Sequence, residues 1–340
     1  MTTPDDRGLV LPLGLDTAIG SLPHTDLDAA VAFALGQQRR LPAAPSLPGR
    51  DPREGMLAQA AWGLVGVQVG ADGTLDVDPA ALDPDAPLGD PGLDGPPFAG
   101  LRAFLDAVAE RRAPIKLQLT GPVTLGIALH AHGVEPDSAF RVAGAAVRAR
   151  ARALLDRAAA TAPHAPVVAF VDEPGLVGLG APGFPLTPDA GVDLTSGALA
   201  ALERGALTGL HCCGATDWNL AIAAGPRIVS VPVGAGIERA AGALGRFLDD
   251  GGWIAWGAVP TDGPIGTSAG RLFRALSATW CDLVRAGCDP VRLRTQAMVT
   301  PACGLAGHGE TQAGQVMALT RQVAARLHDQ AIGVRLSVGA

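Results

Sequence analysis

The stretch "LTGLHCCGATDW" (residues 207–218) contains the unit from which the fold of this chain can be predicted. An apolar run of strand length, 207–213, ends in a histidine and two cysteines, and a turn containing glycine then leads into a helical segment at 217–224. A β-rich run followed by a helix is the unit that builds parallel sheets. The fold therefore depends on how often this unit recurs.

The unit recurs along the whole chain. Further β-rich runs lie at 15–21, 63–69, 114–121, 166–173, 227–233, 253–259 and 292–299. Helical patterns lie at 26–39, 98–111, 137–161, 196–204, 217–224, 238–250, 267–286 and 310–327. Eight strands that alternate with helices predict an α/β fold, a (β/α)8 TIM barrel, as a single domain over 1–340. A doubly wound sheet is the alternative, but chemically capable residues at several strand ends favour the barrel.

Two stretches interrupt the repeat. Residues 41–55 and 71–97 are rich in Pro, Gly and Asp, so we expect both to be long loops, the first of them over the mouth of the barrel.

Composition excludes several classes of protein. Apolar residues make up 48% of the 340 residues and charged residues 17%, which is enough for a sizeable core. A formal charge of −7 and a pI near 5.5 argue against nucleic acid as a partner. No apolar run is long enough to span a membrane. The N-terminal residues lack the pattern of a signal peptide, so we expect a cytoplasmic protein.

The chain has five cysteines. An odd number in a reducing compartment makes a disulfide framework an unfavourable interpretation, which leaves metal binding, catalysis or core packing. Cys281 and Cys288 lie in "LFRALSATWCDLVRAGC", whose apolar spacing is helical, and we expect them to pack as small hydrophobic residues.

The "HCC" sequence predicts part of a metal site. Side chains alternate along a strand, so His211 and Cys213 share one face while Cys212 points to the other. Zinc needs at least three protein ligands, and Cys303, in "PACG" just beyond the last predicted strand, is suitably placed to be the third. The alternatives are a packed strand with His211 hydrogen-bonded in the core, or a Cys–His nucleophile. Strand alternation would keep His211 away from Cys212. An iron–sulfur cluster would require more cysteines.

Five short motifs carry a resemblance to a known family. "TAIGSLPHT" (17–25) resembles the start of the catalytic half of cobalamin-independent methionine synthase. "LQLTGPVTL" (117–125) and "FVDEPGL" (170–176) look like two more of its strand-end motifs, and "HCC" and "ACGL" (302–305) fit its zinc-ligand motifs. The related barrels of uroporphyrinogen decarboxylase and of the methylcobalamin:coenzyme M methyltransferases have a similar "HxCG". The match runs in order over nearly the whole chain and is similar to short, single-barrel members.

The resemblance implies a zinc-dependent methyltransferase of methionine biosynthesis that methylates a thiol, homocysteine, with methyl-folate or a methyl-corrinoid protein as donor. His211, Cys213 and Cys303 would hold Zn²⁺, which favours the thiolate form of the acceptor. Asp172 would bind the substrate amino group with Glu173 beside it. In the same way, the loop that contains Ser21 would bind the substrate carboxylate.

The chain also departs from the family pattern. The family has a further glutamate ligand on the next strand, where this chain has only Glu238, several residues late. Its histidine that delivers a proton to the folate corresponds to about Pro260. The segment "SLPGRDPREGM" (46–56) contains no clear counterpart of its acidic residue that contacts the amino acid.

These departures leave the donor and the acid open. A leaving folate nitrogen needs a proton, whereas a corrinoid cobalt does not. The proton donors that would substitute are His24, His308 and Asp262, of which His24 is our candidate catalytic residue beside Asp172. The other hypotheses are alkyl transfer to another thiol such as coenzyme M, and a barrel that binds zinc or thiols without catalysis.

Overall fold

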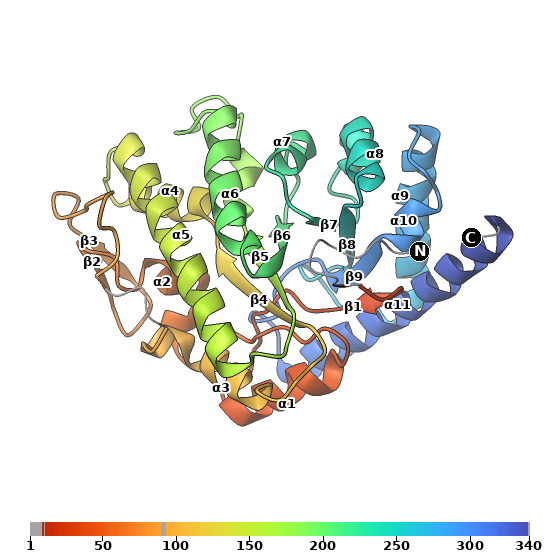
Figure 1. The fold of residues 1–340 in the computed structure, drawn as a ribbon, viewed down its shortest axis with the longest axis horizontal. Coiled ribbons are helices and arrows are strands. Elements are labelled where there is room, and N and C mark those ends of the chain that lie inside the picture. The colour runs from red at the N-terminus through yellow and green to blue at the C-terminus, as the bar shows by residue number, and fades with distance from the viewer. Residues whose placement is uncertain (1–8, 10, 90–92, 339–340) are drawn as a thin grey trace.

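Parallel strands form one curled sheet in the computed structural model, which describes residues 9, 11–89 and 93–338 (Figure 1). In order across the sheet these strands are β1 (Leu15–Asp16), β9 (Ala297–Pro301), β8 (Trp253–Val259), β7 (Ile228–Pro232), β6 (Ala206–His211), β5 (Val167–Asp172) and β4 (Ile115–Thr120). Each neighbouring pair is parallel, so the carboxyl ends of the strands meet at one edge of the sheet.

Both faces of the sheet are buried, as is typical of parallel strands. The strand β5, "VVAFVD", alternates between two apolar clusters, with Phe170 on the inner face and Val171 on the outer. The inner cluster holds one side chain or more from most strands, among them Leu15, Val168, Phe170, Leu207, Ile228 and Met298. Because the sheet curls around this cluster, its inner face is filled by its own side chains.

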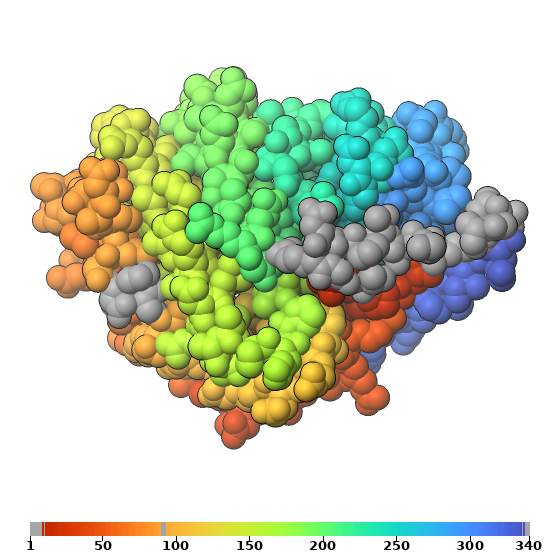
Figure 2. Space-filling view, viewed as in Figure 1, coloured from red at the N-terminus to blue at the C-terminus, as the bar shows by residue number. Residues whose placement is uncertain are grey.

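Helices cover the outer face. They are α1 (Leu27–Gln37), α2 (Met56–Ala61), α3 (Ala99–Ala107), α4 (Pro122–Ala131), α5 (Pro136–Thr161), α6 (Pro188–Glu203), α7 (Trp218–Ala223), α8 (Ala241–Asp249), α9 (Ala269–Arg285), α10 (Arg292–Thr295) and α11 (Glu310–Val338). The space-filling view shows α5 to α9 side by side in chain order (Figure 2). Within the described residues, none of the helices combines the length and the apolar character that crossing a membrane requires.

Helix starts follow local chemistry. The side chains of Asp26, Thr187, Asp217 and Ser268 accept hydrogen bonds from backbone N–H groups in the first turns of α1, α6, α7 and α9. Proline lies in the first turn of α4, α5 and α6, where its missing N–H costs nothing. Short 3₁₀ turns η1 (Pro52–Glu54), η2 (Pro96–Phe98), η3 (Pro174–Gly178) and η4 (Ile237–Ala240) lie in the connections.

The prediction that 63–69 is a strand of the barrel is wrong. In that region β2 (Val67–Val69) pairs antiparallel with β3 (Leu75–Val77), as a hairpin apart from the main sheet. The turn between them explains this. The Asp72 side chain accepts the N–H of Thr74, and Gly73 has φ +79°, which only glycine adopts without strain. The segment 67–69 therefore pairs with the nearby β3 and does not join the main sheet.

Residues 41–47 lie between the two edge strands, β1 and β4. The Lys116 backbone N–H donates to Pro42, and the carbonyl of Lys116 accepts the N–H of Ala44. On the other side the Ser46 carbonyl accepts the N–H of Leu22. The first half of the predicted loop 41–55 is thus part of the wall beside the sheet, while its second half contains η1.

Parts of two predictions fall outside the described residues. The prediction that the chain has no signal peptide rests on an N-terminal stretch that includes residues 1–8 and 10, which lie outside the described residues. The predicted loop 71–97 includes 90–92, and its described part contains β3 and the first two residues of η2. The last strand was also predicted too early, because α10 occupies 292–295 and β9 begins only at Ala297.

Candidate metal centre

Polar side chains gather where the carboxyl ends of β5, β6 and β7 meet. The register sets Asp172 beside His211, and His211 beside Ser230. All of these side chains are at least nine-tenths buried. Cys213 follows β6 by two residues, and Cys303 follows β9, so the turns after two strands bring their sulfur atoms to the same edge.

His211, Cys213 and Cys303 form a group that can hold a metal ion, because their ligand atoms all lie within 4.8 Å of one another. The sequence predicted this grouping from strand alternation, which puts His211 and Cys213 on one face, and from the position of Cys303 just beyond the last predicted strand. Cys212, on the opposite face, is fully buried in the outer apolar cluster. Burial and its apolar surroundings raise the pKa of Cys212 to about 11, so that thiol remains protonated and packs as a hydrophobic residue.

The imidazole of His211 is oriented for ligation through Nε2. Its Nδ1 lies 2.9 Å from Oγ of Ser230, whereas its Nε2 is buried beside the cysteine sulfurs and has no nitrogen or oxygen partner in the described part of the chain. Burial lowers the pKa of His211 and so favours the neutral ring, which is the form that binds metals. The contact with Ser230 fixes the tautomer and the ring angle of His211, so the residues fit a metal ion.

The two sulfur atoms interact with each other. A hydrogen bond from the Cys303 thiol lowers the pKa of Cys213, and the same contact raises the pKa of Cys303. The pKa of Cys213 therefore lies below that of Cys303, and a divalent cation beside both sulfurs would favour the thiolate form of each. Two thiolates and one imidazole are a donor set typical of zinc.

A pocket of about 260 Å³ opens onto this group. His211, Cys213 and Cys303 line it together with Asp172, and Ser21 contributes from the loop after β1. The structure thus brings the predicted metal ligands and two of the predicted substrate-binding residues to one cavity. Its position at the carboxyl edge of the sheet is where α/β barrels bind their substrates.

Asp172 has a buried cation in its surroundings. Burial raises the pKa of Asp172, while the nearby Lys116 ammonium acts in the opposite direction. Lys116 is itself fully buried, donates to the carbonyl of Ile19 and lies 4.7 Å from the ring centre of Phe170. Oδ1 of Asp172 has no hydrogen-bond partner among the described residues, so it can accept a bond from a ligand.

Glu54 is a pocket residue that the sequence reasoning missed. It is buried, its carboxylate accepts the N–H of Leu47 and pairs with Arg50 at 2.9 Å, and it lines the pocket. It lies in "SLPGRDPREGM", the segment in which no acidic counterpart was identified. The only local signal was an acidic residue before a glycine in a Pro-rich stretch, which has no periodicity from which a side-chain direction could be predicted.

Two predicted site residues lie elsewhere. Both oxygens of Glu173 accept hydrogen bonds at the start of α4, and Glu173 does not line the pocket. Its role in substrate binding stays a prediction that this placement does not support. His24 is buried against Phe33, with ring centres 4.8 Å apart, and it does not line the pocket either.

The other residues considered from the sequence are also apart from the metal group. Glu238 lies in η4 and is not a member of the group. His308 and Asp262 do not line the pocket, and Asp262 and Pro260 are exposed. Among the lining residues of the pocket, His211 is the one histidine.

Comparison with known proteins adds no assignment. No family model matches the chain, and no curated protein matches it. What the site does must therefore be argued from its own residues.

Proposed function

We propose that this protein is a zinc-dependent methyltransferase that methylates a thiol, with homocysteine as the first acceptor to test. The observation that carries the proposal is the buried imidazole of His211 beside the sulfurs of Cys213 and Cys303, with all three ligand atoms within 4.8 Å of one another at a ligand-sized pocket. A zinc ion bound there would favour the deprotonated form of an acceptor thiol at neutral pH.

The reaction is a displacement at the methyl carbon. The acceptor sulfur forms the new S–C bond with its lone pair, and the bond from the methyl carbon to the donor breaks with its electron pair remaining on the donor atom. The thiol proton is released before or during the step. A folate nitrogen must take up a proton as it leaves, whereas a corrinoid cobalt needs none.

The residues of the chain supply orientation. Ser230 holds the His211 ring, while the Asp172 carboxylate lines the pocket with its Oδ1 unpartnered among the described residues, which suits a ligand with an ammonium group. The backbone of Ser21 is fixed because its carbonyl accepts the N–H of Leu305, and this bond joins the loop after β1 to the loop of Cys303. Both substrate-facing loops are thus held against each other.

We propose further that the sheet is the wall of a closed (β/α)8 barrel. Residues 41–47 would take the place of the missing strand, because their backbone bonds reach β4 at Lys116 and the segment after β1 at Leu22. This arrangement would exclude water from the interior beneath the pocket, where Lys116 lies.

Metal content is the first test. We expect purified protein to carry stoichiometric zinc, and Cys213→Ser and Cys303→Ala to lose it while their circular dichroism stays unchanged. Cys281→Ala is the matched control, since that cysteine is exposed and outside the group. Wild-type protein that neither contains zinc nor binds it after reloading would contradict the proposal.

Transfer is the second test. Zinc-loaded protein is incubated with homocysteine and either methyl-tetrahydrofolate or methylcobalamin, and methionine is measured by mass spectrometry. Methionine formed with either donor supports the methyltransferase and identifies the donor class. Product from coenzyme M alone would favour the other-thiol hypothesis, and zinc-dependent thiol binding without any product would favour the non-catalytic barrel.

A further inference from the structure

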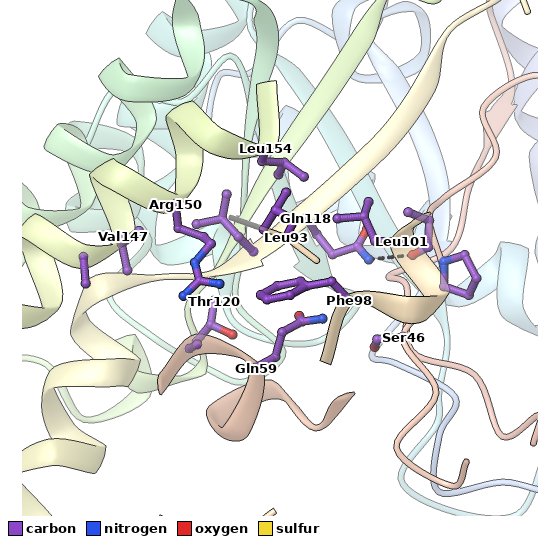
Figure 3. A pocket seen from close by; sticks show the side chains of 15 residues that line it. Ser46, Gln59, Leu93, Phe98, Leu101, Gln118, Thr120, Val147, Arg150 and Leu154 are labelled. Carbon is purple, nitrogen blue, oxygen red and sulfur yellow. Dashed lines mark hydrogen bonds between the residues drawn. The ribbon is translucent and has the colours of Figure 1, made fainter. Parts of the chain in front are cut away.

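A second cavity lies directly beside the pocket of the metal group. It measures about 40 Å³, and the residues that line both cavities are Ser46, Gln59, Gln118, Leu119 and Thr120. From these shared residues it extends outward to Phe98, Leu93 and Leu154, between β4 and α5 (Figure 3). We call this space, between the shared residues and Leu154, the side cavity.

The side cavity exists because the wall next to β4 is irregular. Residues 41–47 form backbone bonds to β4 at Lys116 and then turn toward Leu22. In the described part of the chain, no further backbone hydrogen bond joins them to β4 beyond Lys116. The upper end of β4, from Gln118 to Thr120, therefore has side chains and, among the described residues, no paired backbone on this side, and these side chains line both cavities.

The shared residues have few donors left for a ligand. Gln118 Nε2 donates to the Ala44 carbonyl at 2.7 Å, as Figure 3 shows, and Gln59 Nε2 donates to the Pro97 carbonyl at 2.8 Å. The Thr120 hydroxyl donates to the carbonyl of Met56. Gln118, Gln59 and Thr120 each use a polar hydrogen on the backbone, which leaves fewer donors for a ligand on the residues that line both cavities.

The far end of the side cavity is apolar. Leu93, Phe98 and Leu154 are each at most 4% exposed. The Arg150 guanidinium also lines the cavity, where it lies 4.8 Å from the ring centre of Phe98 and donates to the carbonyl of Trp62. An aliphatic group that entered would contact aliphatic and aromatic carbon on most sides.

We propose that the side cavity binds an apolar arm of the molecule whose sulfur binds at His211, Cys213 and Cys303. This inference rests on the proposed thiol-binding function and narrows its substrate class to thiols that carry a short aliphatic arm. Since about 10–15 Å³ of such space accommodates one water-sized group, the side cavity takes an arm of roughly three carbons beyond the shared residues. Homocysteine itself would leave it unfilled.

Binding of n-alkanethiols from ethanethiol to octanethiol tests the inference. Calorimetry on zinc-loaded protein is expected to give an affinity that rises about fourfold for each methylene that enters the side cavity. The rise should stop once the cavity is full. Ala146→Leu fills the cavity from α5 and Ala60→Val fills it from α2, so each should abolish the rise and leave ethanethiol binding unchanged. Ala160→Leu, exposed on the same helix, is the control that should retain it.

The outcomes separate the inference from the function on which it rests. If ethanethiol and the longer thiols all fail to bind zinc-loaded protein, the thiol-binding function and the side cavity proposal both fall. If ethanethiol binds but affinity is independent of chain length, or the rise persists in a folded filled variant, only the side cavity proposal falls. Should Ala146→Leu not fold, Ala60→Val provides the same comparison from the other wall.

Discussion

At the scale of single residues, Ser230 decides how the metal group is arranged. Its hydroxyl lies 2.9 Å from Nδ1 of His211, and the serine is buried at the centre of β7. An isolated imidazole has two tautomers and can rotate, but this contact leaves Nε2 as the free nitrogen. The bond comes from the neighbouring strand, so no pattern within "HCC" could indicate it.

The first prediction is that Ser230→Ala weakens metal binding about 10- to 100-fold without loss of fold. The ring of His211 would lose its orienting partner while all three ligands remain. Zinc affinity is measured by competition with a chromogenic chelator. Thr208→Val is the control, because the Thr208 hydroxyl is buried without a hydrogen-bond partner in the described structure. Equal zinc affinities for wild type and Ser230→Ala would contradict the role assigned to Ser230.

At the scale of elements, Glu173 joins β5 to α4. Its carboxylate oxygens each lie 2.8 Å from a backbone nitrogen in the first turn of α4, those of Val123 and Thr124. A Cβ atom at Gly121 would lie 2.2 Å from the Glu173 carboxyl carbon, so only glycine lets the two segments approach this closely. The motifs "LTGPVT" and "VDEP" thus form two halves of one helix cap.

The second prediction is that Glu173→Ala lowers the free energy of unfolding by about 2–4 kcal/mol, because it leaves buried N–H donors without acceptors. Glu135→Ala is the matched control. Glu135 caps α5 in the same way through the N–H of Ser138, but at an exposed position where a lost cap costs about 1 kcal/mol. Urea denaturation followed by circular dichroism measures both. A loss for Glu173→Ala no larger than that for Glu135→Ala would contradict this account.

The elements that the sequence predicted well are those with a clear pattern. Apolar runs such as 166–173 and 253–259 correspond to β5 and β8, because strands buried on both faces leave continuous apolar sequence. Burial on all sides also explains why the sequence did not predict the helix α4. Its residues are apolar and mostly buried all round, so they have no helical periodicity. Segment 63–69 was misassigned because a short apolar run does not say which strand it pairs with.

The site, like the fold, could be predicted only where its residues follow a pattern in the sequence. Alternation along β6 and the place of Cys303 after β9 were sufficient to group the metal ligands. Glu54 and Ser230 enter through the tertiary arrangement, from a loop and from a strand without a distinctive motif. Ligand types at strand ends can be predicted from sequence, whereas the residues that hydrogen-bond to those ligands can be identified only once the register between strands is known.

At the scale of the whole molecule, the accessibility of Lys116 to a reagent indicates whether the sheet and residues 41–47 close off the interior. It is the single lysine of the chain, and its side chain lies among the inner residues beneath the pocket. Burial lowers its pKa, so at alkaline pH a larger share of it is in the reactive, unprotonated form than of an exposed lysine. Protonation then does not protect it, and an amine-reactive reagent is kept away only by the surrounding wall, which includes residues 41–47.

The last prediction is therefore that Lys116 reacts with an amine-specific reagent at pH 9 only when the whole chain unfolds. Its modification, followed by mass spectrometry of the peptide that contains it, should be slower than that of an exposed amine by a factor of roughly a thousand or more. Arg112→Lys supplies the exposed amine in the same molecule, because position 112 is at the surface. The rate at Lys116 should rise with urea along the global unfolding curve. Fast, urea-independent modification of Lys116 in folded protein would mean that the wall opens locally at 41–47, and the closed barrel would have to be abandoned.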